Sequence, residues 1–557
     1  MPYTQLECDV LIVGGGLAGT NAALAATEQG AEVIVAEKGC LERSGDVGGG
    51  VDHFMAYLNS GESWDTREGF LRYVEKSALG STDLDVIDAV YCSELANALE
   101  RMERIGVSLR MPGGEYYRTK GMGQPGPLFI NFKGKRLKPQ LAKAVRSAGC
   151  RVLDRLMALR LLTHDGEIWG ALGMHTRTGE FFSIRAGATV ISTGNTNRLF
   201  LNPRGNPFNS WLCPYDTGDG QRMALEAGAR LSNMEYMRMT LMPKGFSSAG
   251  YNGMVSMGGR FLNGLGHYYM ENAHPQGNLA PRNVVLAQSL EELKAGRGPL
   301  YIDCTHLQAT DLEHLLTILS YEKDSMPDYF AQRGEDLRTM PVEMTVSEGM
   351  QAGPTEVTGS GLCIDAQSAC SLPGLFACGD AADHNRAVHG AVTGGYHAGR
   401  HAALAARNRK RKPEQPVPED ELAGYLAPLS RATGYGYMAY EEALRRIMSE
   451  HAGTERSERS LREGMRKLRR LEGLWTEIQA TDMHELARAH ESRGLLAVGK
   501  TLMAAALFRE ESRFSPFHYR LDYPHTDNAR WCGQVEVSLN DSGFHANFCP
   551  RPARFGA

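Results

Sequence analysis

The stretch CDVLIVGGGLAG, residues 8–19, decides the fold of this chain. Residues 8–13 are a mostly apolar, β-forming run that leads straight into three glycines. The next segment, residues 20–30, is typical of a helix that ends at Gly30, and residues 31–39 (AEVIVAEKG) are a second apolar run. A strand, helix and strand within about 30 residues predict a parallel βαβ unit of a buried sheet.

The glycines have the GxGxxG spacing of a dinucleotide site. Gly14 permits a tight turn, Gly16 lets a pyrophosphate reach the backbone, and Gly19 lets the helix pack closely on the strand. Glu37 closes the second strand 23 positions after Gly14, where an acidic side chain suits a ribose hydroxyl. In this context, dinucleotide binding is favoured over a purely structural glycine turn.

Composition narrows the class of protein. A chain of 557 residues allows two to four domains, and a net charge of -5 offers no electrostatic case for nucleic acid binding. No apolar run reaches about 18 residues, so no membrane span is predicted. The N-terminus enters a strand without a targeting segment, which favours the cytoplasm. We interpret the basic run at residues 407–412, which precedes a proline-rich stretch, as a linker.

The cysteines argue against metal centres in this chain. Eleven cysteines are scattered singly, without a CxxC pair. We therefore expect no iron–sulfur cluster, no structural zinc and no other metal site, but reduced thiols.

A second nucleotide-binding segment lies far along the chain. The strand-like runs ATVISTG (188–194) and GLFACGD (374–380) resemble the later parts of two-dinucleotide-fold flavoproteins. The second run lies more than 300 residues after the first glycines, which favours FAD over NAD. Asp380 would meet a ribityl hydroxyl or a phosphate; the alternative is that it caps the following helix.

The fold class predicted is α/β: a Rossmann-like FAD-binding domain with an inserted α+β capping domain and a C-terminal helical domain. The predicted boundaries are 1–239 and 346–412 for the two parts of the FAD-binding domain, 240–345 for the capping domain, and 413–557 for the helical domain and tail.

Several motifs together resemble one superfamily of flavoprotein subunits. These are the N-terminal glycine segment, EKGCLERSGDVGGGV (37–51), DTGDGQRMALEAGA (216–229), LAPRNVV (279–285), GLFACGD, and REESRFSPFHYRLDYPHTDNARW (509–531). The chain resembles succinate dehydrogenase, fumarate reductase, L-aspartate oxidase and adenylylsulfate reductase flavoproteins over nearly its whole length. A flavin monooxygenase would lack the last of these motifs.

The resemblance implies bound FAD, a mobile cap over the isoalloxazine, and oxidoreduction of a small substrate at flavin N5. The flavin-wrapping segment has no histidine until His53, which implies noncovalent FAD. The resemblance and the motifs assign the following residues to FAD: Gly14, Gly16, Leu17, Ala18, Glu37, Lys38, Arg43, Ser44, Gly45, Gly48, Gly49, Gly50, Thr193, Gly194, Asp219, Gly379, Asp380 and Thr393.

Departures from the motifs separate the branches. Dicarboxylate enzymes carry a substrate histidine where this chain has EGMQAGP (348–354), and an arginine where it has Thr393. The run AGRGPLYID (295–303) and the segment HGAVTGGYHAGR (389–400) show a better resemblance to the alpha chain of adenylylsulfate reductase. A dicarboxylate oxidoreductase and a freestanding oxidase or dehydrogenase remain alternatives.

Four side chains are the candidates for chemistry. We expect Arg282 to stabilise negative charge over the flavin, with a cap-to-body salt bridge as the alternative. His389 would hold an oxyanion or carry a proton, or would instead be a satisfied buried histidine. Lys244 and His53 are the predicted substrate contacts, although a lysine that only faces solvent fits Lys244 equally.

The glycines of residues 389–400 are expected to bring backbone against the flavin ring, with a helix beginning near Thr393. Because the chain lacks iron–sulfur ligands, the resemblance implies that the electron partner is a separate ferredoxin-like iron–sulfur subunit. A noncatalytic protein that only holds FAD for electron relay is the contrasting hypothesis.

Overall fold

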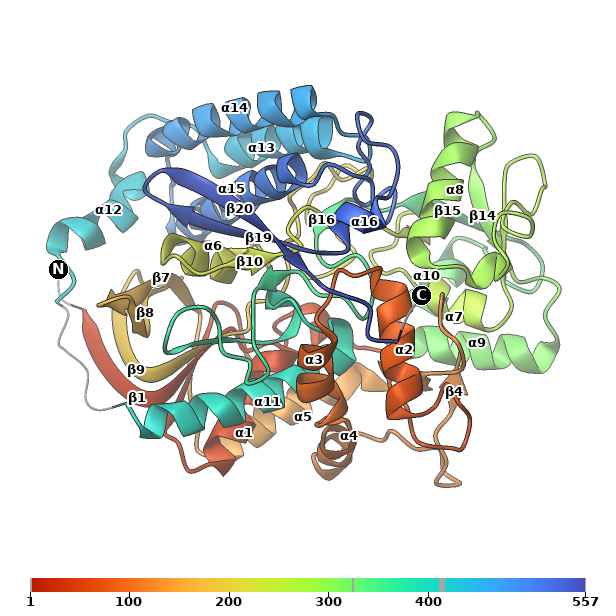
Figure 1. Ribbon diagram of the computed structural model, residues 1–557, viewed down its shortest axis with the longest axis horizontal. Helices are drawn as coiled ribbons and strands as arrows, with labels where there is room; N and C mark the ends of the chain where they lie inside the picture. Colours follow the sequence, from red (N-terminus) through yellow and green to blue (C-terminus); the bar gives the residue numbers. More distant parts are fainter. Residues whose placement is uncertain (1–2, 323–324, 410–415, 556–557) are drawn as a thin grey trace.

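The computed structural model describes residues 3–322, 325–409 and 416–555. The predicted domain boundary at 412–413 and the second half of the basic linker lie outside these residues. The arrangement is mixed α/β: a sheet with helices at its lower side, a helical layer above it and a separate α/β unit at one end (Figure 1).

The central sheet carries the dinucleotide fold. Its order is β6–β2–β1–β9–β8–β7, and β18 also pairs with β9. Strands β6, β2, β1, β9 and β18 run parallel, whereas β7 and β8 join as antiparallel strands. The strands are β1 (Thr4–Val13), β2 (Val33–Glu37), β6 (Arg151–Asp154), β7 (Leu156–His164), β8 (Glu167–His175), β9 (Phe181–Ile191) and β18 (Leu375–Ala377).

Helices α1 (Leu17–Glu28) and α11 (Ala387–Arg407) lie side by side beneath this sheet (Figure 1). Their approach depends on glycines: a Cβ on Gly395 would lie 2.3 Å from the Ala18 carbonyl oxygen, and one on Gly399 would lie 2.1 Å from that of Ala22. Those distances are too short for any side chain, so only glycine lets the two backbones meet.

This contact corrects the expectation for residues 389–400. The helix begins at Ala387 and not near Thr393, so the segment lies inside α11. Its glycines admit the backbone of α1 and of the preceding loop, since a Cβ on Gly390 would lie 2.0 Å from the Asn385 carbonyl oxygen. Thr393 itself donates its hydroxyl hydrogen bond to the His389 carbonyl, one turn back in the helix.

A second α/β unit forms from residues 241–346. Its sheet has the order β12–β15–β14–β13 and is covered by helices with a buried apolar core of their own. Its elements are β12 (Leu241–Pro243), α7 (Tyr251–Ser256), β13 (Arg260–Leu262), α8 (Arg282–Lys294), β14 (Leu300–Asp303), α9 (Ala309–Glu322), α10 (Ser325–Gln332) and β15 (Val342–Val346). We call this unit the cap.

The chain enters and leaves the cap through a two-stranded neck. β11 (Met237–Arg238) comes directly before β12, β16 (Met350–Gln351) follows β15, and the two strands pair antiparallel. A smaller sheet, β3–β5–β4, lies on the body side. Its strands and the helices near it are β3 (His53–Met55), α2 (Arg67–Ala78), α3 (Leu84–Ile87), α4 (Leu95–Arg104), β4 (Arg118–Thr119), β5 (Phe129–Asn131) and α5 (Leu137–Ser147).

The C-terminal part is helical, as predicted, but its tail is not a free extension. The tail forms a hairpin, β19 and β20, in which β19 pairs with β10 of the body. The elements are β10 (Leu231–Ser232), β17 (Gly361–Leu362), α12 (Glu419–Ser430), α13 (Tyr437–Ala452), α14 (Glu458–Leu474), α15 (Met483–Phe508), α16 (Asn528–Trp531), β19 (Gly533–Asn540) and β20 (Gly543–Pro550). Backbone pairing across the predicted domain boundary makes this part continuous with the FAD-binding domain.

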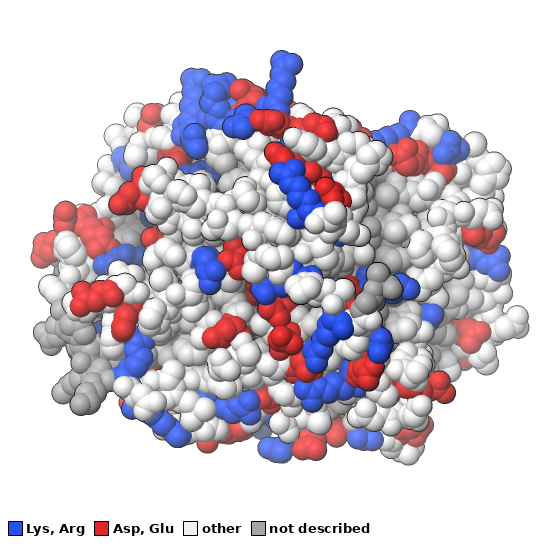
Figure 2. All heavy atoms as spheres, in the orientation of Figure 1, with Lys and Arg blue, Asp and Glu red and all other residues white. Residues whose placement is uncertain are grey.

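Charges of both signs are interspersed over the face in Figure 2, and basic side chains gather at its upper edge, over α14. Arg462 and Arg466 there pair with glutamates of the same helix. Among the described residues, no helix combines the length and apolar character needed to cross a bilayer.

Replacing Gly395 by alanine tests the α1–α11 contact. The new methyl group would press on the α1 backbone, and we expect the free energy of unfolding to fall by about 1–3 kcal/mol, measured by urea denaturation. Gly424→Ala in α12 is the matched control, because no atom lies within 4 Å of the added carbon. The control should be neutral or stabilising by up to about 1 kcal/mol. Equal effects of the two changes would contradict the close contact.

Candidate active site

One long cavity opens where the parallel strands β1, β2 and β9 end. Its empty volume is about 1580 Å³. The lining comes from the glycine loop, the segment after β2, the end of β9, the cap helix α8 and the loop before α11. Segments separated by hundreds of residues therefore share one site, at the edge where parallel α/β sheets bind ligands.

The glycine loop has the geometry of a pyrophosphate cradle. Gly14 has φ +97°, and a Cβ on it would lie 2.6 Å from the Ser192 carbonyl oxygen. A Cβ on Gly19 would lie 1.9 Å from the Gly14 oxygen, so neither position tolerates a side chain. Gly16 precedes α1 and brings no side-chain cap, which leaves the first N–H groups of the helix free for an anion. These observations fit the phosphates of a dinucleotide.

Next to the cradle, Glu37 closes β2 and is held by the backbone. Its carboxylate accepts hydrogen bonds from the Gly15 N–H (2.7 Å) and the Gly39 N–H (2.6 Å). Lys38 follows, with its ammonium 2.6 Å from Asp219 and 2.9 Å from Glu491. Burial alone would lower the pKa of Lys38, but the two carboxylates outweigh burial and raise it.

Glu491 was not predicted from sequence. It lies on α15, is fully buried, and also pairs with Arg198 at 3.0 Å. No local signal marks a glutamate in a long helix as a partner of a lysine more than 450 positions earlier. Only the fold brings the C-terminal helix against this end of the cavity.

Most predicted FAD contacts line the cavity. These are Gly14, Gly16, Leu17, Ala18, Glu37, Lys38, Ser44, Gly45, Gly50, Thr193, Gly194, Asp219 and Asp380. Asp380 combines both roles considered for it, since it lines the cavity and also accepts a hydrogen bond from the N–H of Ala387, the first residue of α11. Thr193 Oγ1 and Asp219 Oδ1 are buried without hydrogen-bond partners, as polar atoms that await a ligand would be.

Five predicted contacts do not line the cavity: Arg43, Gly48, Gly49, Gly379 and Thr393. Gly48 serves the local turn, because a Cβ there would lie 2.0 Å from the Arg43 carbonyl oxygen. Gly379 has φ +64° and packs against Ala18. Arg43 is exposed and lines a neighbouring hollow instead. These glycines shape the wall without forming its surface.

At the other end of the cavity, Arg282 reaches in from the cap. It is the first residue of α8, and its side chain is 9% exposed. Its guanidinium donates hydrogen bonds to Thr240 Oγ1 (2.5 Å), Asn252 Oδ1 (3.1 Å), Glu356 Oε1 (3.3 Å) and the Tyr251 hydroxyl. The predicted cap-to-body salt bridge is therefore present, and the same side chain lines the cavity.

Two further arginines meet Arg282 around Glu356. Arg238, on the neck, pairs with Glu356, and Arg386, before α11, pairs with Asp380 at 2.8 Å. Burial alone would raise the pKa of Glu356, but the three arginines outweigh burial and hold it well below the usual carboxylate range. Burial lowers the pKa of Arg238 to about 9, against the opposing effect of Glu356. Arg386, Arg238 and Glu356 were missed because no motif flags them.

His389 does not line the cavity. It lies in the first turn of α11, 2% exposed, with its ring edge-on to Phe54 and Tyr91. Burial lowers its pKa to about 4, although Glu356 acts in the opposite direction. The imidazole is therefore neutral at physiological pH and lies behind the cavity wall, which is the buried-histidine alternative with its Nε2 unpartnered.

His53 does line the cavity, at the start of β3. Its Nδ1 lies 2.7 Å from Asp52 Oδ1, and Asp52 lines the cavity beside it. Lys244, in contrast, is a correction. Its side chain is 57% exposed, its ammonium pairs with Glu343 at 2.7 Å, and it lies on the outside of the cap sheet, away from the cavity.

A second, larger hollow between cap and body shares Asn252, Arg282 and Glu356 with the cavity. Its walls include the aromatic side chains of Trp64, Phe129 and Phe514. The Arg282–Glu356 pair therefore stands between the two spaces.

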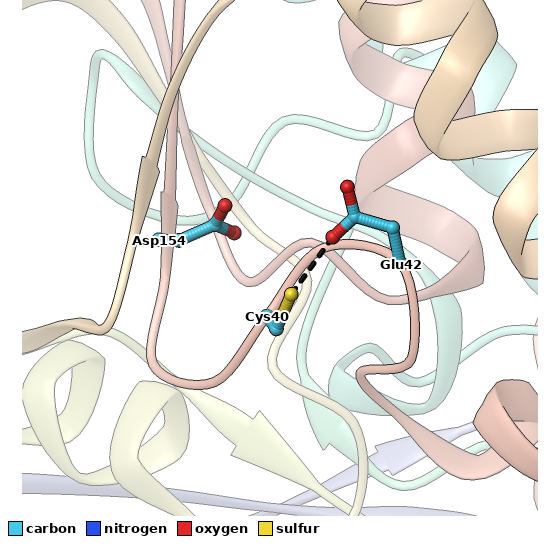
Figure 3. Close-up of side chains that lie close together, drawn as sticks. All are labelled: Cys40, Glu42 and Asp154. Atoms are coloured by element: carbon cyan, nitrogen blue, oxygen red, sulfur yellow. Dashed lines mark hydrogen bonds between the residues drawn. The ribbon is translucent and has the colours of Figure 1, made fainter.

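One cluster away from the cavity carries metal-binding side chains. Cys40, Glu42 and Asp154 converge at the exposed end of β2, with the cysteine sulfur turned toward Glu42 (Figure 3). Arg146 lies 2.9 Å from Glu42 and 2.8 Å from Asp154. Both carboxylates are thus paired by one guanidinium, and the cluster needs no ion.

Comparison with known proteins decides the family. A family model described as FAD binding domain matches residues 9–396, which is more than half of the chain. A second model, described as fumarate reductase flavoprotein C-term, matches residues 441–550. The chain belongs to this family of FAD-binding flavoproteins. The predicted fold class and family are confirmed, and the flavoprotein is an FAD-dependent oxidoreductase.

Its relatives have several activities. An L-aspartate oxidase from Streptomyces coelicolor is 29% identical, with 97% of this chain and 93% of the relative covered. A flavoprotein of the CoM/CoB fumarate reductase from Methanothermobacter marburgensis is 26% identical, with 93% and 95% covered. The chain thus matches relatives with different substrates over almost their full length.

Solved structures share the fold. Adenylylsulfate reductase from Archaeoglobus fulgidus has a TM-score of 0.89 at 23% identity, covering 99% of this chain and 97% of that chain. A quinol fumarate reductase from E. coli has a TM-score of 0.82 at 21% identity, covering 99% and 98%.

The neutral state of His389 predicts acid sensitivity. Its folded pKa lies below the value for an unfolded histidine, so protonation favours unfolding and stability falls as pH drops from about 6.5 toward 4. His389→Gln should reduce the slope of unfolding free energy against pH by at most about 1.4 kcal/mol per pH unit in that window. Urea titrations at several pH values measure the slope.

The exposed His484 supplies the control, and His484→Gln should leave the slope unchanged. A His389→Gln slope that equals that of the unmodified flavoprotein would contradict the neutral buried imidazole.

Proposed function

We propose that the flavoprotein transfers two electrons between noncovalently bound FAD and a small anionic substrate. The supporting observation is that Arg238, Arg282 and Arg386, from neck, cap and body, meet at one end of the cavity around a single Glu356. With Asp380 counted as well, the five groups carry one excess positive charge. A buried cationic end favours a carboxylate, sulfonate or phosphate group.

Bound FAD would supply the two-electron chemistry, and the protein supplies binding, orientation and electrostatics. Arg282 is held by four hydrogen-bond acceptors, so its charge has a fixed position without reorganisation. Trp211 lines the cavity beside Arg282, with the guanidinium carbon 5.3 Å from its ring centre. The indole and the cap together limit access of water to this end.

The structure around residues 348–354 supports a substrate site different from that of the dicarboxylate branch. Glu348 accepts a hydrogen bond from the backbone N–H of Trp211 (2.6 Å) and pairs with Arg204 (2.5 Å), so it holds the residue that carries the indole. Thr393 is turned into α11 and does not reach the cavity. An adenylylsulfate-reductase-like reaction on a small anion is the proposal that these departures support.

A dicarboxylate oxidoreductase is the second candidate. The sequence relatives favour it, since an L-aspartate oxidase is 29% identical over almost the whole chain. For the first candidate we propose that the electron partner is a ferredoxin-like iron–sulfur subunit, whereas oxygen would serve an oxidase. A brown complex after purification of the tagged flavoprotein from its native cells supports the first. Rapid oxygen consumption by the isolated chain with L-aspartate supports the second.

Arg282→Ala tests the proposed site. We expect retained FAD and a loss of kcat/KM of about 10²–10³-fold, because a fixed charge over the reacting atoms is removed. Reoxidation of dithionite-reduced flavin by fumarate, iminoaspartate or adenylylsulfate, followed at the flavin absorbance band, measures the rate. Lys244→Ala is the matched control on the cap surface and should change the rate less than about twofold.

Unchanged turnover in the Arg282→Ala flavoprotein with full FAD content would end the catalytic proposal. That result would instead support a protein that only holds FAD for electron relay.

Noncovalent binding has a direct test. We expect acid precipitation of the flavoprotein to release all yellow absorbance into the supernatant as intact FAD, because no covalent link is proposed. Mass spectrometry of the precipitated chain should give the mass of the polypeptide alone. A yellow pellet with a mass increase equal to FAD would overturn this proposal.

A further inference from the structure

Asp52 and His53 form a hydrogen-bonded pair on the cavity wall. Asp52 Oδ1 and His53 Nδ1 are 2.7 Å apart, and both residues line the cavity with Arg282 and Glu356. The Asp52 residue is 6% exposed, whereas the His53 side chain is 21% exposed. A buried carboxylate behind an accessible imidazole is the arrangement by which proteins orient a proton-transfer group.

The ring of His53 is held in place from its other sides. It lies 4.0 Å from the Phe129 ring at an interplanar angle of 37°. β3 pairs with β5, which sets His53 opposite Asn131, and the Asp52 carbonyl accepts a hydrogen bond from the Phe132 N–H at 2.9 Å. With Nδ1 held by a carboxylate, Nε2 is the ring nitrogen that exchanges a proton.

The other groups at this end do not suit proton transfer at neutral pH. Arginine stays charged, and Arg282 uses its donors on four acceptors. Arg238, Arg282 and Arg386 keep Glu356 ionised, and burial raises the pKa of the Tyr251 hydroxyl.

His389, on α11, is the remaining histidine that acts on His53 electrostatically, and it is neutral and lies behind the wall. The charged groups around His53 are therefore Asp52 from its own segment, Arg282 from the cap, and Glu356, Asp380 and Arg386 from the body.

We propose that His53 is the catalytic proton carrier of the reaction and that Asp52 is its positioning residue. This inference rests on the proposed function and narrows its substrate class to small anions with a C=C or C=N bond. In the reducing direction, one atom of that bond accepts a hydride, with its electron pair, from the reduced cofactor. The other atom takes the proton as the His53 Nε2–H bond breaks, and the neutral imidazole regains a proton from water.

Asp52→Asn separates positioning from a merely structural role. The carboxylate favours imidazolium, so its loss lowers the pKa of the His53 ring. An acid must be protonated to act, so the limb of kcat/KM that falls as pH rises should move to lower pH by about one unit. His53→Gln should lose about 10²–10⁴-fold in kcat/KM and lack that limb.

A second readout does not depend on turnover. Diethyl pyrocarbonate modifies neutral imidazole, and peptide mass spectrometry gives the modification rate of His53 at each pH. We expect the midpoint for His53 to move down by about one pH unit in Asp52→Asn. The exposed His484 in the same sample should keep its midpoint. FAD content and circular dichroism verify that both variants are folded, and His53→Gln serves if Asp52→Asn does not fold.

The outcomes separate the two proposals. If the unmodified flavoprotein reduces a C=C or C=N anion but Asp52→Asn keeps both its limb and its midpoint, the positioning role is overturned. If His53→Gln keeps its rate, the proton carrier is overturned while the proposed function stands. If reduced flavin is not reoxidised by any small anion, the proposed function fails and this inference fails with it.

Discussion

The contact between α1 and α11 is the constraint on which the site depends. Both helices lie on one face of the central sheet, and glycines let their backbones touch. This contact fixes where α1 begins and hence where its free N–H groups point. It also fixes the loop before α11, which carries Asp380 and Arg386. The phosphate end and the cationic end of the cavity are thus placed relative to each other by a contact between two backbones.

The cationic end has a different physical character. Its arginines are desolvated, which is costly, and Glu356 and Asp380 compensate only part of their charge. Because neck, cap and body each contribute one arginine, the charges converge only when the cap is in place. A strongly positive end that assembles on closure favours anions in the closed state over the open one.

Sequence reasoning succeeded where function is encoded locally. The GxGxxG loop, Glu37 and Asp380 follow strands directly, and such positions are predictable because parallel strands end at one edge of a sheet. It was wrong where the glycines of residues 389–400 were assigned to the flavin, since helix packing and ligand contact require the same small residue. It missed Glu356 and Glu491, whose partners depend on tertiary structure. The contact of Arg282 with substrate stays a prediction, although its place in the cavity is observed.

The pairing of Lys38 with Glu491 has a consequence for biosynthesis. Lys38 belongs to the first βαβ unit, whereas Glu491 lies on a helix near the end of the chain. At cellular rates of translation, Glu491 leaves the ribosome on the order of tens of seconds after Lys38. During that interval the nascent nucleotide fold has its glycine loop but lacks the carboxylate that neutralises its lysine. Cofactor loading therefore belongs to the finished polypeptide, and a ribosome that stops before α15 releases a chain with an incomplete pocket.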